Sequence, residues 1–478
     1  MEQDRELNMT QFRNSGIKNR TMIERSNYFE QNTRDTDPDA PRQDTRKGEI
    51  TGQDLSLPDM EFGMPIRSSY SGERLRRDVL TQSRMDFDLF DERDDRQDQV
   101  GYHDPINPIS PTYSSISAGS EKVIPELYGT DPGSFISANI NKYSVTLFEL
   151  LKGSLCDKFC ISPYGIFHLF GTLYFASSGI TESDIYDYFT MVSKENILEG
   201  LSHIKKFGLD PQMTMKHMIL IDDTLPINRE FIKYVAHLVD VYPIGVGLWK
   251  KEAKNLNDYL HKLFQGTVEP ISERILERVK ILGITAGVIK PGWRIPFDVV
   301  EKRFQTQGAP RRPARMLAQL DQKYPYYEDH RHQIIEIPCT GDALVMGVIL
   351  PKESAIPDVS PDELNIAIKN LKVTNIAEVM IPIFTQRIKI KLTNLLYQHG
   401  LRSVFHRATV PDLVKSETVV TDIVQNLTIV VGAPPRPPSK KGYAGPSVSN
   451  VKFLADHPFI YYFRLTPTNT VIAMGHFN

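Results

Sequence analysis

The chain has 478 residues, enough for one large domain or two to three average ones, and its 40% hydrophobic and 24% charged residues are typical of a soluble globular protein. A formal net charge of -3 argues against nucleic acid or an acidic membrane as a partner. The 3 cysteines, at positions 156, 160 and 339, are too few for a disulfide framework and lack the second pair that a cysteine zinc site needs, so we expect small buried thiols.

The chain starts MEQDRELNMTQFRNSG, a stretch with no apolar core, so we expect no secretion signal. Nowhere does a run of about 18 apolar residues predict a membrane span. We therefore expect a protein that is intracellular or packaged in an assembly, with no membrane partner.

Residues 1–134 form an extension rich in Arg, Asp, Gln, Asn, Ser and Pro, in which apolar residues appear singly. Such a segment cannot bury enough apolar surface to offset its ordering entropy, so we expect it to be largely disordered or ordered by a partner. Its charges of both signs are interleaved, unlike a basic arm for nucleic acid. Three short apolar clusters have two open interpretations, docking motifs for a protein partner or chance members of a spacer: Met60–Met64, Met85–Phe90 and Val123–Tyr128.

Residues 135–478 have the patterning of a globular domain. In chain order, helical spacing or length predicts helices over residues 140–151 and, after a Ser-Pro start, 161–177. Apolar runs predict buried strands over 213–221 and 279–289, the second followed by Pro-Gly-Trp. Later segments read as strands: 331–350, a pair around a Cys-Thr-Gly-Asp turn, and the alternating segments 378–392 and 460–477. Helices precede most strands, which favours an α+β fold.

Six segments, in this order, resemble the serpin family over nearly all of residues 135–478. They read FCISPYGIFHLFGTLYFASSGITESDIYDYF, LNDYLHKLFQGTVEPI, ILGITAGVIKPGWRIPF, PARMLAQLDQKYPYYEDHRHQIIEIPCTGDALVMGVILPKE, IPIFTQRIKIKLTNLLYQHGLRSVF and FLADHPFIYYFRLTPTNTVIAMGHF. The last contains the signature Asp456-His457-Pro458-Phe459. The resemblance implies the serpin fold: helices packed around a large mixed sheet, smaller antiparallel sheets, and an exposed reactive-centre-like loop, here residues 432–450.

The resemblance also implies a mechanism. Inhibitors of this family offer the loop as bait to a serine or cysteine protease, and the cut loop then inserts as a new strand into the large sheet. The chemistry belongs to the protease, so the protein itself is not expected to be an enzyme. The inhibitor needs a cleavable bond, a loop that can become a central strand, and a sheet that can open.

The start of this loop is unsuited to insertion. Where the family has a run of small residues, the chain reads Gly432-Ala433-Pro434-Pro435-Arg436-Pro437-Pro438. Each proline lacks an N–H and has a fixed φ, which confines it to strand edges, strand starts and bulges. The hinge prolines therefore argue against insertion into the middle of a sheet. The segment 434–438 also resembles a polyproline ligand, although an exposed stiff loop is the favoured interpretation.

Three further positions depart from the family. In the hydrogen-bonded latch where the family's sheet opens, Ser162 is kept, but Gly165, Thr285 and Gln425 replace a Ser, an Asn and a His. Counting back from His457-Pro458-Phe459, the resemblance implies a nominal scissile bond near Ser447, within the poor bait Gly445-Pro446-Ser447-Val448. Trypsin-like cleavage sites lie closer to the hinge, at Arg436, Lys440 and Lys441.

No other constellation predicts chemistry. Residues 329–332 (Asp-His-Arg-His) are interpreted as a solvated turn and not a metal site, and His168 as a satisfied core residue. The chain lacks a P-loop, a dinucleotide fingerprint, H-E-x-x-H and G-x-S-x-G, so no cofactor is expected.

The sequence thus predicts a serpin fold that has lost protease inhibition. It would act as a binding or structural component of an assembly such as a virus particle or a cytoskeletal complex, with the N-terminal extension as a tether to protein partners. The alternative is a serine or cysteine protease inhibitor acting through residues 432–450, for example as a blocking ligand without insertion. A carrier or chaperone role is a third possibility that no feature singles out.

Overall fold

The computed structural model describes residues 132–154, 159–207, 211–341, 343–353, 359–433 and 449–478, all within the second of two compact units of the chain, residues 108–478. Helix α3 begins at Pro132 and so spans the boundary expected between residues 134 and 135. The helices of the described residues are α3 (Pro132–Ser154), α4 (Pro163–Ala176), α5 (Gly179–Phe189), α6 (Lys194–Phe207), α7 (Arg229–Val235), α8 (Trp249–Leu263), α9 (Pro361–Asn370), α10 (Thr393–Gln398) and α11 (Ser403–His406), with single 3₁₀ turns η1 (Val246–Leu248) and η2 (Glu273–Leu276). None of them is both long and apolar enough to cross a bilayer.

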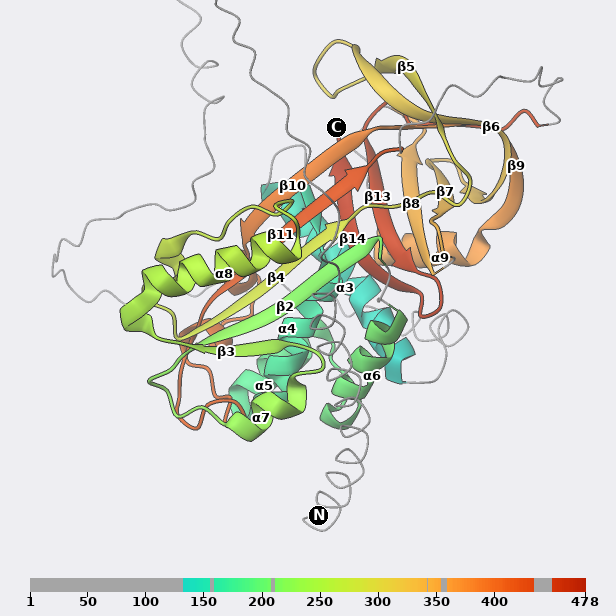
Figure 1. Ribbon diagram of the computed structural model, residues 1–478. Helices are drawn as coiled ribbons and strands as arrows, with labels where there is room; N and C mark the ends of the chain where they lie inside the picture. Colours follow the sequence, from blue (N-terminus) through green and yellow to red (C-terminus); the bar gives the residue numbers. More distant parts are fainter. Residues whose placement is uncertain (1–131, 155–158, 208–210, 342, 354–358, 434–448) are drawn as a thin grey trace, which may run out of the picture. The chain divides into compact units, whose positions relative to one another are not determined.

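A mixed five-stranded sheet occupies the centre of the unit (Figure 1). Its order is β10 (Phe384–Lys391), β11 (Val420–Val431), β4 (Ile281–Ile289), β2 (Met213–Asp222) and β3 (Asp240–Ile244). Strands β11 and β4 are parallel, as are β2 and β3, while the other two pairs are antiparallel.

Helices cover both faces of this sheet. On one face, Ala253 and Leu260 of α8 pack with Met218 of β2 and Leu282 of β4 in a small apolar cluster. Helix α4 lies on the other face of the sheet. In the view of Figure 1, α8 crosses in front of the sheet and α4 lies behind it. Helix α4 starts where Ser162 caps it, since the Ser162 hydroxyl accepts the Gly165 N–H at 3.1 Å and Pro163 needs no donor there.

The remaining strands join into one nine-stranded sheet that is antiparallel except at one edge, where β12 runs parallel to β9. Its order is β1 (Phe159–Ile161), β14 (Thr470–Phe477), β13 (Phe459–Leu465), β8 (Leu344–Pro351), β7 (His332–Pro338), β6 (Arg312–Glu328), β9 (Lys372–Pro382) and β12 (Lys452–Leu454), with β5 (Asp298–Phe304) paired to β6. The predicted α+β class, with a mixed sheet and antiparallel strands beside it, is confirmed.

The elements expected from the sequence are present, with two differences. The alternating segment 378–392 is two strands, because β9 and β10 lie in different sheets and are separated by a single residue, Ile383. The segment 460–477 is the hairpin β13–β14, which is buried on both faces rather than alternately, so that Ile460 and Tyr462 are as inaccessible as Phe459.

The described cysteines have the buried environment expected of them. Within the described residues neither Cys160 nor Cys339 forms a disulfide, both are fully buried, and burial raises the pKa of the Cys160 thiol to about 12. Cys156 lies outside the described residues.

Two strand pairs of the large sheet depend on a glycine beneath a tyrosine ring. Gly347 of β8 lies opposite Tyr462, and Gly475 of β14 opposite Tyr461. A Cβ at Gly347 would overlap the Tyr462 ring, which is fully buried and cannot move aside.

We therefore expect Gly347→Ala to lower the free energy of unfolding by about 1–3 kcal/mol, measured by urea denaturation. Gly247→Ala is the matched control, since an added Cβ there meets no atom within 4 Å. Equal urea midpoints for the two variants would contradict the overlap.

Candidate functional site: the β4–β11 pair and the loop that follows it

The loop predicted to be functional leaves the sheet at its centre. Strand β11, which precedes the loop, pairs with β4 in parallel from Val420 opposite Ile281 to Ile429 opposite Ile289. A chain that leaves β11 and turns back runs antiparallel to both strands. The β4–β11 pair is thus the place where such a chain would enter the sheet, and in this structure the two strands are paired directly.

The first loop residues are held at the end of β11. The indole N–H of Trp293 donates to the Gly432 carbonyl at 2.7 Å, and Trp293 packs edge-on against Phe297 with ring centroids 5.2 Å apart. Ala433 packs against the main apolar core. The other predicted loop residues lie outside the described part of the chain: Pro434, Pro435, Arg436, Pro437, Pro438, Lys440, Lys441, Gly445, Pro446, Ser447 and Val448.

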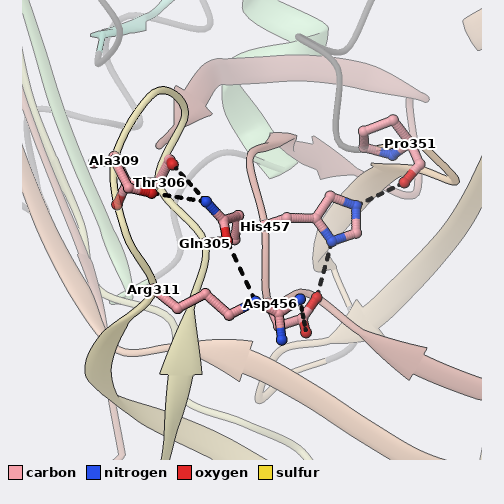
Figure 2. Close-up of polar contacts among 7 residues, drawn as sticks. All are labelled: Gln305, Thr306, Ala309, Arg311, Pro351, Asp456 and His457. Carbon is pink, nitrogen blue, oxygen red and sulfur yellow. Dashed lines mark hydrogen bonds and ion pairs between the residues drawn. The ribbon is translucent and has the colours of Figure 1, made fainter.

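The chain re-enters the fold through β12 and the signature residues Asp456 and His457 (Figure 2). The two ring nitrogens of His457 lie 2.9 Å from Asp456 Oδ1 and 2.7 Å from the Pro351 carbonyl oxygen. The Asp456 carbonyl accepts the Gln305 N–H at 2.6 Å. These contacts tie the end of the loop to β8 and to the β5–β6 hairpin. Pro458 follows as an unpaired residue, and the buried Phe459 begins β13.

All four predicted latch residues lie on the α4 side of the β4–β11 pair. The Ser162 N–H donates to Gln425 Oε1 at 2.7 Å, and the Ser162 hydroxyl donates to the Ile472 carbonyl at 2.8 Å. Gln425 in turn donates to the Cys160 carbonyl at 3.2 Å. Gln425 is only 1% exposed, so these bonds lie in a dry interior where an unmade one is costly. The substituted latch is therefore still hydrogen-bonded.

Gly165 and Thr285 form the second half of the latch. A Cβ on Gly165 would overlap the Thr285 hydroxyl, so the glycine makes room for the threonine. The Thr285 hydroxyl lies 3.0 Å from His217 Nδ1, on the neighbouring strand β2. Sequence reasoning missed His217; the signal was a polar Lys-His pair inside the apolar run MTMKHMILI.

The expectation that His168 is a satisfied core residue is wrong. His168 is fully buried, but among the described residues neither ring nitrogen has a hydrogen-bond partner, and the ring stacks on His217 with ring centroids 4.7 Å apart. Burial lowers the pKa of His168 well below its usual value. Burial, reinforced by the Lys205 and Lys216 charges, lowers the pKa of His217 to about 3. The pair is therefore neutral over the whole range in which free histidine titrates.

Polar side chains also fasten the other face of β11. Asn426 donates to the Glu269 carbonyl at 2.5 Å and Thr428 to the Thr267 carbonyl at 3.1 Å, while Lys389 of β10 reaches the Pro270 carbonyl at 3.0 Å. Residues 267–270 connect α8 to η2. The segment after α8 is thus fixed across β10 and β11. If β11 separated from β4, this segment would have to move with β11, or these hydrogen bonds would have to break.

The structure offers little for other chemistry. Within the described residues, no three His, Cys, Asp or Glu side chains are placed to hold one metal ion. The Asp-His-Arg-His segment is the turn between β6 and β7, in which Asp329 Oδ1 accepts the N–H groups of Arg331 and His332 at 2.7 Å each. His330 and Arg331 are exposed in this turn, whereas His332 is the first residue of β7 and only 5% exposed.

The latch can be tested with a double-mutant cycle. Gly165→Ala alone should destabilise the protein by about 1–3 kcal/mol because of the overlap with Thr285, and Thr285→Ala by about 1 kcal/mol for the lost hydrogen bond. The double variant should lose less than the sum, with a coupling of about 0.5–3 kcal/mol, because the shorter side chain at position 285 leaves room for the new methyl group. Additive free energies of unfolding in urea would show that the two positions are independent.

The buried histidines predict a pH dependence. In the unfolded chain a histidine binds a proton below pH 6.5, its ordinary pKa. In the folded chain His217 binds one only below about pH 3. Stability should therefore fall with falling pH in this window, by about 1.4 kcal/mol per pH unit for each such histidine. His217→Gln, which can still bond Thr285, should reduce the slope by that amount in urea titrations at about pH 6, 5 and 4. An unchanged slope would exclude the histidine as the cause.

Comparisons with known proteins agree with this architecture. A family model described as "Serpin (serine protease inhibitor)" matches residues 138–478. An uncharacterized serpin-like protein of Acanthamoeba polyphaga mimivirus is 23% identical over 313 residues, which cover 59% of this chain and 75% of that protein. Serpin A3-1 of Bos taurus is 20% identical over 370 residues, covering 72% and 89%. The crystal structure of native protease nexin-1 with heparin superposes with a TM-score of 0.65 at 19% sequence identity. The match covers 73% of this chain and 100% of that one. With the family model matching well over half its length, the chain belongs to the serpin family.

Proposed function

We propose that this serpin has lost the suicide-trap mechanism and acts as a binding or structural component of a larger assembly. Residues 1–134 would serve as the tether to protein partners, inside a cell or within a packaged assembly such as a virus particle or a cytoskeletal complex. A serpin-like protein of mimivirus among the relatives supports the viral setting.

The proposal rests on the four prolines that follow Ala433. A strand inserted between β4 and β11 would begin at this end of the sheet, where Ile289 and Val431 end their strands. In a central strand, the backbone groups of successive residues form hydrogen bonds alternately with the two flanking strands. Pro434 and Pro438 would therefore offer no N–H donors to one flanking strand. Pro435 and Pro437 would offer none to the other.

The cost can be compared with the stability of a domain. A buried polar group left without a partner costs about 1–3 kcal/mol, so four unmatched carbonyls cost about 4–12 kcal/mol. A whole domain has a net stability of only about 5–15 kcal/mol. Insertion would also have to break the parallel β4–β11 pairing and the Trp293 bond to Gly432.

A protease inhibitor remains the second candidate. The loop still follows β11, the strand next to the insertion site, and carries basic residues at Arg436, Lys440 and Lys441, of which Arg436 is protected by Pro437 and the two lysines are cleavable. Such an inhibitor would act through residues 432–450, either by insertion or as a blocking ligand without it.

The two candidates differ in what a cut loop does to stability. We would leave trypsin a single cleavable bond in the loop, the one after position 447. To do so, Arg436, Lys440 and Lys441 are replaced by Gln and Ser447 by Arg. In this background we expect cleavage to leave Tm within a few degrees and to form no SDS-stable adduct, because the loop cannot enter the sheet. An inserted loop would raise Tm past about 90 °C.

The matched control carries the same changes with all four hinge prolines replaced by Ala or Thr. A rise in Tm on cleavage in this variant alone would identify the prolines as the barrier. A rise or an adduct in the proline-containing variant would overturn the proposal and restore the inhibitor.

A further inference from the structure

A pocket lies beside β2 near the point where β3 begins, and the proposed function does not use it. Strand β3 pairs with β2 from Asp240, opposite Met218, to Ile244, opposite Asp222. Residues 213–217 of β2 therefore have β4 on one edge, while no described strand lies along their other edge. A cavity of about 390 Å³ is lined by this stretch, by the end of α6 and by the segment that enters β3. Its volume is in the range of about 300–1,000 Å³ that is usual for small-molecule sites.

The pocket has an apolar side. Met213 and Met215 of β2 and Leu238, which precedes β3, line it. Met213 is 5% exposed and Leu238 2%, and Met215 is partly buried against the main apolar core. Flexible thioether side chains adapt to what they contact, so this side suits an apolar body of variable shape.

Two buried polar side chains of the pocket have unused hydrogen-bonding capacity. Tyr164, in the first turn of α4, is 3% exposed, and its hydroxyl has no hydrogen-bond partner among the described residues. Burial alone raises the pKa of Tyr164, so the hydroxyl stays protonated and can donate. His217 Nδ1 lies 3.0 Å from the Thr285 hydroxyl, which leaves Nε2 for a ligand. When Thr285 donates to Nδ1, the neutral ring carries its proton on Nε2 and can donate as well.

Lys205, in the last turn of α6, adds a cation that lacks a carboxylate partner. Its ammonium donates to the His237 carbonyl at 2.5 Å, and within the described residues no carboxylate lies within 4 Å of it. The carboxylate of the pocket, Asp240, is already bound by Lys216 and by the Tyr242 hydroxyl at 2.8 Å. Burial and the Lys216 charge lower the pKa of Lys205, so an anion beside Lys205 would stabilise its charged form.

We propose that this pocket binds a small amphipathic carboxylate, such as a fatty acid or an aryl-substituted acid. The carboxylate accepts from Lys205, with Tyr164 and His217 as further donors, and the apolar body packs against Met213 and Met215. A monoanion fits better than a phosphate, because two lysines and one aspartate leave the lining with a net charge of +1. None of these residues belongs to the loop 432–450, so the inference holds whether or not the loop inserts.

Octanoate, titrated into the full chain, is the probe, and octanamide is its neutral counterpart with the same hydrocarbon chain. By isothermal titration calorimetry we expect saturable octanoate binding, and octanamide binding about tenfold weaker because it lacks the charge. In protein labelled with ¹³C at the methionine methyl groups, octanoate should shift the resonances of Met213 and Met215. Those of Met346 and Met474, which are fully buried in the large sheet, should stay unchanged.

Matched variants test the proposed contacts. Lys205→Gln should weaken octanoate binding about tenfold, whereas Lys205→Arg should retain it. Lys206→Gln, a change at the next residue of α6, is the control, because Lys206 is exposed and does not line the pocket. Tyr164→Phe removes only a hydroxyl and should weaken binding roughly threefold. Thermal melts establish that each variant folds.

Four results would overturn the proposal. Octanoate could fail to bind saturably, or octanamide could bind equally well. The variants Lys205→Gln and Lys206→Gln could bind octanoate with the same affinity. Finally, the methyl shifts could occur at methionines other than Met213 and Met215, which would place the ligand elsewhere. The proposed function is tested by loop cleavage, so either proposal can fail while the other stands.

Discussion

The structure depends on one backbone ladder, the parallel pairing of β4 with β11 at the centre of the mixed sheet. The ladder extends to Ile429 opposite Ile289, and buried backbone N–H and C=O groups are almost always paired in a dry interior. A new strand could enter only by replacing every bond that it breaks. The prolines after Ala433 lack the donors for that exchange. The β4–β11 ladder is therefore the arrangement that any inserted strand would have to replace.

The substituted positions around the ladder are mutually adjusted. Gly165 has no side chain, and Thr285 fills the space that one would occupy. The Thr285 hydroxyl lies within hydrogen-bond distance of His217. The Gln425 amide accepts from the Ser162 N–H and donates to the Cys160 carbonyl, at the strand that leads into α4. A decayed latch would show unsatisfied groups at these four positions. Within the described residues, none of these four positions has a buried side-chain polar atom without a hydrogen-bond partner, whereas both ring nitrogens of His168, which stacks on His217, lack one. The four positions are therefore packed or hydrogen-bonded in the closed sheet.

Much of this could be predicted from the sequence, and the exceptions have physical causes. The ordered series of serpin-like segments predicted the fold, and the buried strands 213–221 and 279–289 were identified by apolar runs alone. The division between β9 and β10 was not predicted. Only one residue separates the two strands, and their assignment to different sheets depends on tertiary packing, which the local sequence pattern does not show. His217 and the bond from Trp293 to Gly432 were also missed, since they join positions 68 and 139 residues from their partners. The hinge prolines could be interpreted from sequence because their effect is local: each removes its own donor.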